Sequence, residues 1–225
     1  MYEFITGPLL WLSFVIFFVG CIARIIWYIR GLNWQMDRVA YTYHKVHGLK
    51  GAARSVVSWL FPFATRSWRN KPGMTLLFFV FHIGVLVTPI FLLAHNMILK
   101  ERWGFSLWTL SETAADIMTI AVIVSAVFLV LRRIALPEVR ILTTAYDYLL
   151  IAITVAPFIT GFVASHEPGH YQFWLILHIL CGEILLIAVP FTKLSHLVLF
   201  FCSRIQLGMD YGIKRGGMKG KGLAW

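Results

Sequence analysis

The chain has 225 residues, of which 59% are hydrophobic and only 13% are charged. A soluble domain is about 45–50% apolar and about 25% charged, so this composition excludes an ordinary soluble protein and indicates an integral membrane protein. The net charge of +10 comes from loops beside apolar segments. This placement indicates contact with anionic lipid and excludes nucleic acid as a partner.

Five apolar segments are long enough to cross a bilayer as helices, which takes about 20 residues each. Because every backbone polar group must be satisfied inside the bilayer, we expect an all-α integral membrane protein built as a five-helix bundle. The first segment lacks a basic start and a small-residue cleavage site, so we expect no cleavable signal peptide. The expected helices cover residues 8–28, 74–99, 113–131, 141–165 and 172–203.

The basic residues orient these five helices. Residues 30–71 carry eight lysines and arginines, residues 132–140 carry three and residues 204–221 carry five, whereas the opposite side has only Lys100 and Arg102. Cytoplasmic loops are enriched in lysine and arginine. The sequence therefore predicts an N-terminus outside the cytoplasm and a cytoplasmic C-terminus.

The connection between the first two helices, residues 31–73, is too long for a simple turn. Basic and aromatic residues alternate in it at helical spacing, which predicts one or two amphipathic helices at the cytoplasmic interface. These would either anchor the chain to lipid or form a docking platform for a soluble subunit. We divide the chain into a membrane domain over residues 1–205, which includes this interfacial segment, and a basic cytoplasmic tail over residues 206–225.

Two of the apolar segments carry histidines. The fifth has His178 and His196, which are 18 residues apart and so point the same way on a continuous helix, one near each membrane face. The second has His82 and His95 and runs antiparallel to the fifth. At matched depths, His82 therefore pairs with His196 near the cytoplasmic face, and His95 pairs with His178 near the outer face.

The helical phase of the second segment conflicts with this pairing. His82 and His95 are 13 residues apart, which leaves them about 140° out of phase on an ideal helix. Pro89 lies between them and should kink the helix and change that phase. Pro190 lies between His178 and His196 and weakens the five-turn count there in the same way.

Ionisable side chains inside a bilayer indicate a functional site. Four histidines in two depth-matched pairs are what two bis-histidine haems b require. One haem at either pair is a second possibility. Metal transport would want carboxylate or thiolate ligands at the same level, and a haem-free anchor or scaffold would use the histidines only as packing contacts. The three cysteines form no CxxC or CxxCH pattern, which argues against c-type haem or an iron–sulfur cluster within this chain.

Five spans, an outside N-terminus and two histidines on each of the second and fifth spans resemble the dihaem cytochrome b (gamma) subunit of respiratory nitrate reductase. The short length and the segment WQMDRVAYTYHKVHGLKGAARS look closer to the membrane cytochrome b subunits of Hmc-, Tmc- and Dsr-type transmembrane redox complexes of sulfate reducers. The resemblance covers residues 5–205, and its specificity comes from the four histidines.

The resemblance implies a multi-pass protein of the bacterial inner membrane that serves anaerobic respiration. It implies electron relay between menaquinone or a periplasmic multihaem cytochrome c and a cytoplasmic iron–sulfur subunit like heterodisulfide reductase, beside other membrane subunits. His82, His95, His178 and His196 would be the axial ligands of two haem irons, and the chain would have no catalytic residue of its own. Menaquinol oxidation and menaquinone reduction both stay open as activities of the assembly.

A quinone site would need a proton donor or acceptor near a haem at the membrane edge. Lys100 and His170 flank the predicted outer ends of the helices, and Glu183 lies inside the fifth span. On the functional interpretation, one of them exchanges protons with a quinone head group. On the structural one, Lys100 and His170 cap solvated loops and Glu183 hydrogen-bonds an imidazole.

Overall fold

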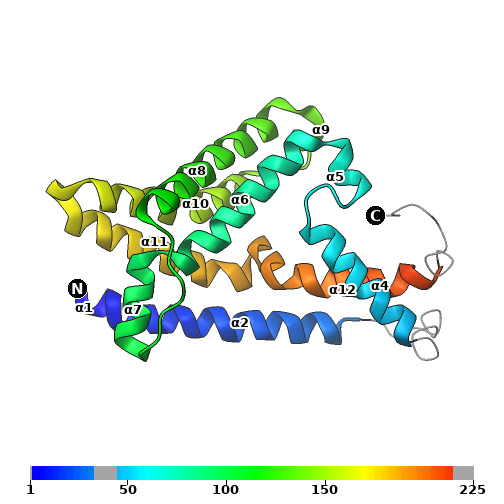
Figure 1. Ribbon diagram of the computed structural model, residues 1–225, viewed down its shortest axis with the longest axis horizontal. Helices are drawn as coiled ribbons and strands as arrows, with labels where there is room; N and C mark the ends of the chain where they lie inside the picture. The colour runs from blue at the N-terminus through cyan, green and yellow to red at the C-terminus, as the bar shows by residue number, and fades with distance from the viewer. Residues whose placement is uncertain (1, 33–44, 215–225) are drawn as a thin grey trace. The chain divides into compact units, whose positions relative to one another are not determined.

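Five helices of the described chain are long and apolar enough to cross a membrane. The computed structural model describes residues 2–32 and 45–214, without the side chains of His47, Pro168 and residues 211–214. All regular structure in these ranges is helical (Figure 1), so the all-α fold class with five spans is confirmed. The spans are Tyr2–Arg30, Pro72–Phe91, Glu112–Ala135, Ala145–His166 and Tyr171–Phe191.

Large apolar side chains lie on the outside of these spans. Phe18, Val19, Ile117 and Ile184 are each more than half exposed. A protein surface in water rarely presents so continuous an apolar face, whereas lipid tails would cover it. This exposure is consistent with a multi-pass membrane protein.

The first span is assembled from three helical pieces. These are α1 (Tyr2–Phe4), the π-helical turn η1 (Ile5–Leu9) and α2 (Leu10–Arg30). Pro8 lies in the π-helical turn. Proline has no N–H for the helical ladder, and the wider turn accommodates it without ending the helix.

By its contacts the described chain divides into two units, each made of separate stretches of sequence. The first unit comprises residues 1–11 and 76–185, and the second comprises residues 12–75 and 186–225. The helices that lie largely in the first unit are α6 (Pro72–Phe91), α7 (Leu93–Trp103), α8 (Glu112–Ala135), α9 (Pro137–Arg140), α10 (Ala145–His166), the 3-10 turn η3 (Pro168–His170) and α11 (Tyr171–Phe191).

The buried core of the first unit lies where three spans meet. Phe81 of α6 packs with Val122 and Ala126 of α8 and with Val155 and Phe158 of α10. Small and large side chains alternate at these positions, so the helices interdigitate closely. This core packs α6, which carries His82, together with α10, which carries Gly161.

Side-chain caps define the start of α10. The carboxylate of Asp147 accepts hydrogen bonds from the backbone N–H of Thr144 at 2.8 Å and from its hydroxyl at 3.0 Å. Arg133 of α8 donates to the hydroxyl of Thr143 at 3.1 Å. These contacts satisfy the free N–H end of α10 and tie it to the end of α8.

The second unit contains the segment that joins the first two spans. Its helices α4 (Lys45–Leu60) and α12 (His196–Lys214) pack against each other (Figure 1). At their crossing a Cβ on Gly208 would collide with the carbonyl oxygen of Gly51 and lie 2.8 Å from Cα of Ala52. The close approach therefore requires glycine at position 208. The unit also holds α5 (Arg66–Asn70) and the 3-10 turn η4 (Lys193–Ser195).

The described part of the segment expected to be interfacial contains the helices α4 and α5, separated by the non-helical residues 61–65, and its place at the cytoplasmic interface stays a prediction. Residues 33–44 of that segment and residues 215–225 of the expected tail lie outside the described residues. The expected tail begins as helix, because α12 continues to Lys214. The boundary after residue 205 therefore falls inside a helix.

The second and fifth expected helices, residues 74–99 and 172–203, are each interrupted, in keeping with the disturbance that Pro89 and Pro190 predict. The backbone leaves the helix at Leu92 (φ −67°, ψ 134°), between α6 and α7, and at Thr192 (φ −121°, ψ −174°), between α11 and η4. Pro89 and Pro190 come shortly before these breaks and remove helical hydrogen bonds there. The five-turn argument that places His178 and His196 on one helical face therefore fails, because the chain between them is not one helix.

Candidate functional site

The four histidines that the sequence singles out each lie beside a backbone carbonyl oxygen. His82 lies in α6, His95 in the first turn of α7, His178 in α11, and His196 is the first residue of α12. Their Nδ1 atoms lie 2.8 Å from the carbonyl oxygen of Phe78, 2.7 Å from that of Pro89, 2.8 Å from that of Pro157 and 2.9 Å from that of Lys193, respectively.

These contacts determine the tautomer of each imidazole. Because a carbonyl oxygen only accepts, Nδ1 carries the proton and Nε2 keeps its lone pair. A metal-bound histidine almost always donates its other ring N–H to a carbonyl, carboxylate or water, which holds the ring in place. All four side chains therefore have the tautomer that an axial haem ligand needs.

His95 and His178 lie together within the first unit. Their ring centroids are 6.0 Å apart and their ring planes differ by 18°. A ring nitrogen lies about 2 Å from a bound transition-metal ion and the ring centre about 1 Å further, so two imidazoles on one ion have centres roughly 6 Å apart. The centroid distance of this pair alone matches that of two imidazoles on one haem iron, and the role of the two rings as a ligand pair stays a prediction.

The imidazole of His178 is held against α10 by two features that the sequence analysis missed. Its N–H donates to the carbonyl oxygen of Pro157, which is 21 positions earlier in the chain. It also lies over Gly161, where a Cβ would be 2.9 Å from both Cε1 and Nδ1 of the ring. A glycine one turn after a proline in the fourth span is the signal that could have suggested this contact.

His196 belongs to the second unit and borders a hollow there. The hollow has a volume of about 310 Å³, and Arg204 also lines it, with its guanidinium carbon 4.7 Å from the ring centre of Trp59. A ring nitrogen and a cation at one apolar hollow fit a haem with its propionates, since arginine is the preferred partner of carboxylates. The pairing of His82 with His196 stays a prediction. The lining residues are Tyr28, Trp59, His196, Leu199, Phe200, Ser203 and Arg204.

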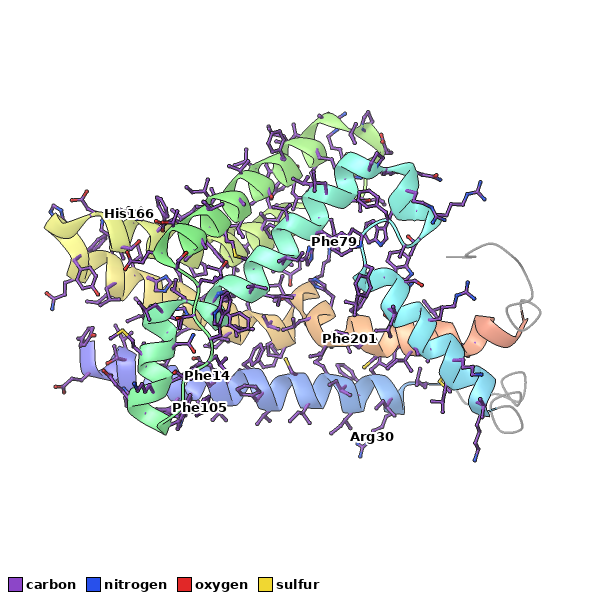
Figure 2. The ribbon with its side chains drawn as sticks, in the orientation of Figure 1. Phe14, Arg30, Phe79, Phe105, His166 and Phe201 are labelled. Atoms are coloured by element: carbon purple, nitrogen blue, oxygen red, sulfur yellow. The ribbon has the colours of Figure 1, made fainter. Side chains whose placement is uncertain are left out.

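Of the three side chains expected near a quinone, Lys100 and His170 are exposed, whereas Glu183 is buried. Lys100 is exposed on α7, and His170 is exposed in η3. His166, the last residue of α10, has a carboxylate partner, because its Nε2 lies 3.4 Å from Oδ2 of Asp116. Figure 2 shows His166 at the end of α10. A proton-exchange role for Lys100 or His170 stays a prediction.

Glu183 is buried inside α11. Its side chain is 2% exposed, and neither carboxylate oxygen has a hydrogen-bond partner among the described residues. An ionised carboxylate without a partner in such surroundings costs several kcal/mol. The position therefore suits a carboxyl group that is neutral or that exchanges a proton with a bound molecule.

No group of three or more histidine, cysteine, aspartate or glutamate side chains that could hold a metal ion occurs in the described part of the chain. Metal transport would need such mixed ligands, whereas a haem needs only two histidines from the protein.

Two proteins are similar to this chain in sequence. A protein of Nitratidesulfovibrio vulgaris (strain Hildenborough) is 56% identical over an alignment of 226 positions that covers all of both chains. The respiratory nitrate reductase 1 gamma chain of Escherichia coli (strain K12) is 25% identical over an alignment of 194 positions that covers 66% of this chain and 85% of that one. No protein-family model and no solved structure matches the chain.

Proposed function

The chain belongs to the same family as the Nitratidesulfovibrio vulgaris protein, and we propose that it is a membrane cytochrome b subunit of a respiratory redox complex. The distant similarity to a respiratory nitrate reductase gamma chain supports a membrane electron-transfer subunit within a larger complex. The five apolar spans agree with that role. The Hmc-, Tmc- or Dsr-type assignment is the finer part of the proposal.

One observation carries the proposal above all others. It is the pair His95 and His178, whose near-parallel imidazoles have centroids 6.0 Å apart. Each ring donates its Nδ1–H to a backbone carbonyl, so both present Nε2 as a ligand. His178 lies inside the fifth span, where an ionisable side chain is expensive unless it binds something, and His95 lies in α7, just beyond the second span.

In this proposal the chain binds two haems b. His95 and His178 hold the outer one, His82 and His196 hold the inner one, and Arg204 pairs with a propionate beside His196. Bound haem supplies reversible one-electron transfer. The protein's own contribution is to orient the four rings through their carbonyl partners and to keep water away from them by the packing of the spans.

The partners follow from the proposed topology. With the N-terminus in the periplasm and the C-terminus in the cytoplasm, the basic residues of α4 and α5 face anionic lipid and a cytoplasmic iron–sulfur subunit. Menaquinone or a periplasmic multihaem cytochrome c exchanges electrons at the outer side. Lys100, His170 and Glu183 are the candidates for proton exchange with a quinone head group.

The rival function is a haem-free anchor or scaffold whose histidines only make helix contacts. The two are separated by a pyridine haemochrome assay and a dithionite-reduced spectrum of the purified full chain. We expect two haems b per chain. His82→Ala and His196→Ala should each lose one, and His95→Ala and His178→Ala should each lose the other.

His166→Ala is the matched control for these substitutions. This histidine is exposed and its Nε2 faces Asp116, so the variant should keep both haems. A wild-type chain with no haem would refute the electron-transfer proposal and leave the scaffold. A chain with one haem would refute the two-haem relay and identify the pair that binds it.

A further inference from the structure

The break between α6 and α7 exposes carbonyl groups that a continuous helix would satisfy. Two of these carbonyl oxygens accept hydrogen bonds from neighbouring side chains of α7. Nδ1 of His95 lies 2.7 Å from the carbonyl oxygen of Pro89, and Nδ2 of Asn96 lies 2.9 Å from that of Ile90. Asn96 Nδ2 also lies 3.0 Å from the carbonyl oxygen of Leu92, the residue at the break.

The same asparagine reaches the loop that follows α7. Its Oδ1 accepts from the backbone N–H of Leu107 at 2.9 Å, and nearby the N–H of Leu110 donates to the carbonyl oxygen of Phe91 at 2.9 Å. Asn96 is 1% exposed. Its amide therefore makes three hydrogen bonds in a buried place and joins the end of α6, the break and the loop.

The break changes the direction in which His95 points. On one continuous helix His82 and His95 would be about 140° out of phase, and the backbone at Leu92, with ψ of 134°, resets that phase. His95 then lies with its ring centroid 6.0 Å from that of His178. Whatever stabilises the break thereby determines the position of the His95 ring.

We propose that Asn96 is a positioning residue for His95, holding the α6–α7 break open so that this imidazole faces His178. The inference rests on the proposed function, in which the two rings bind the outer haem. Buried polar groups that lose their partner are unfavourable by roughly 1–3 kcal/mol each. Without the side-chain amide of Asn96, the carbonyl oxygen of Ile90 loses its side-chain donor, and that of Leu92 keeps only the backbone N–H of Asn96 at 3.0 Å, so the break is free to rearrange.

Two substitutions test this role. Asn96→Leu keeps the approximate size and removes all three hydrogen bonds, and Asn96→Asp keeps an acceptor for Leu107 but removes the donors to Ile90 and Leu92. Loss of a group that orients a metal ligand typically weakens metal binding about 10–100-fold. We expect both variants to release the outer haem to excess apomyoglobin roughly 10–100-fold faster than wild type, with the inner haem unchanged.

The readout must separate positioning from general stability. The electron paramagnetic resonance signal of the oxidised outer haem, identified by its absence in His95→Ala, should shift in both Asn96 variants. Thr119→Val is the matched control, because Thr119 is also buried in the first unit and its hydroxyl donates to the carbonyl oxygen of Ala115 at 2.8 Å. That variant should lose stability without moving the signal.

Leu107→Pro provides a second route, since it deletes the N–H that reaches Asn96 without changing Asn96. An unshifted signal and an unchanged release rate in the Asn96 variants would overturn the inference. Failure of the Asn96 variants to accumulate, together with an unaltered outer haem in Leu107→Pro, would assign Asn96 to folding alone and also overturn it, whereas a shifted outer-haem signal in Leu107→Pro would support it. A wild-type chain without an outer haem would instead refute the proposed function.

Discussion

The imidazole of His178 lies so close to Gly161 of α10 that a Cβ on the glycine would be 2.9 Å from its Cε1 and Nδ1 atoms. The ring also donates to the carbonyl oxygen of Pro157, one turn earlier on α10. α10 thus supplies both the acceptor for the ring and the space in which the ring lies. His178 is therefore oriented by a helix that carries none of the four histidines.

Gly161→Ala should displace the His178 imidazole and break its hydrogen bond to Pro157. Because that bond orients the ring, we expect about 10–100-fold weaker binding of the outer haem. Haem content and release rate of the purified chain measure this effect. Gly73→Ala is the control, since nothing lies within 4 Å of a Cβ there. Equal haem retention in the two variants would contradict the positioning role of α10.

Arg204→Gln should affect the inner haem and spare the outer one. Arg204 shares a hollow with His196 and lies 4.7 Å from the ring centre of Trp59. Loss of the cation–π contact should lower stability by about 0.5–1 kcal/mol. Removing a positive charge beside a haem favours the oxidised iron, so the midpoint potential of the inner haem should fall.

A redox titration of both haems measures this shift. Arg69→Gln is the control, because Arg69 is exposed in the last turn of α5. An unchanged midpoint potential of the inner haem in Arg204→Gln would show that Arg204 does not lie beside that haem. An equal shift in Arg69→Gln would point to a general effect of surface charge.

Glu183→Gln should leave both haems in place and slow their reduction by a water-soluble menaquinol analogue. Glutamine keeps the shape of the buried side chain but cannot exchange a proton. Loss of a positioned proton acceptor typically lowers the rate by about 10²–10⁴-fold. Stopped-flow spectroscopy at the haem absorption band measures the rate.

The comparison variant for Glu183 is Glu112→Gln, an exposed carboxyl group in the first turn of α8, for which we expect the wild-type rate. A normal rate in Glu183→Gln would assign the buried carboxyl group to structure. Lys100→Gln and His170→Gln would then be the remaining candidates for the proton-exchange group.

Gly208→Ala should loosen the packing of α4 on α12. The added Cβ would lie 2.8 Å from Cα of Ala52 and against the carbonyl oxygen of Gly51, so backbone must move, and overpacking of this kind typically destabilises by about 1–3 kcal/mol. We expect a protease to cleave α4 faster than in the wild-type chain, and we expect loss of the haem at His196. Gly7→Ala, with nothing within 4 Å of its Cβ, should behave as wild type. Unchanged protease resistance in Gly208→Ala would contradict the tight crossing.

Much of the fold could be predicted because the bilayer restricts the composition and the backbone hydrogen bonding of every segment that crosses it. A span must be apolar over its length, so composition alone located all five spans, but the second and fifth end at Phe91 and Phe191, 8 and 12 residues before the expected ends at residues 99 and 203. The positions of the breaks at Leu92 and Thr192 could not be predicted from the sequence in the same way. Pro89 and Pro190 indicated a disturbed helix, but the residue at which the backbone leaves the helix depends on which donors reach the freed carbonyls.

The sequence by itself determined that the chain is an all-α membrane protein with five spans, and it led to the prediction of two histidine pairs at matched depths. Depth along a helix follows from residue number, and this led to the pairing of His95 with His178. Only the tertiary structure decided that His178 bonds to Pro157 over Gly161 and that Asn96 joins the break at Leu92 to the following loop. These contacts connect different helices and loops, and helical periodicity carries no information about which of them meet.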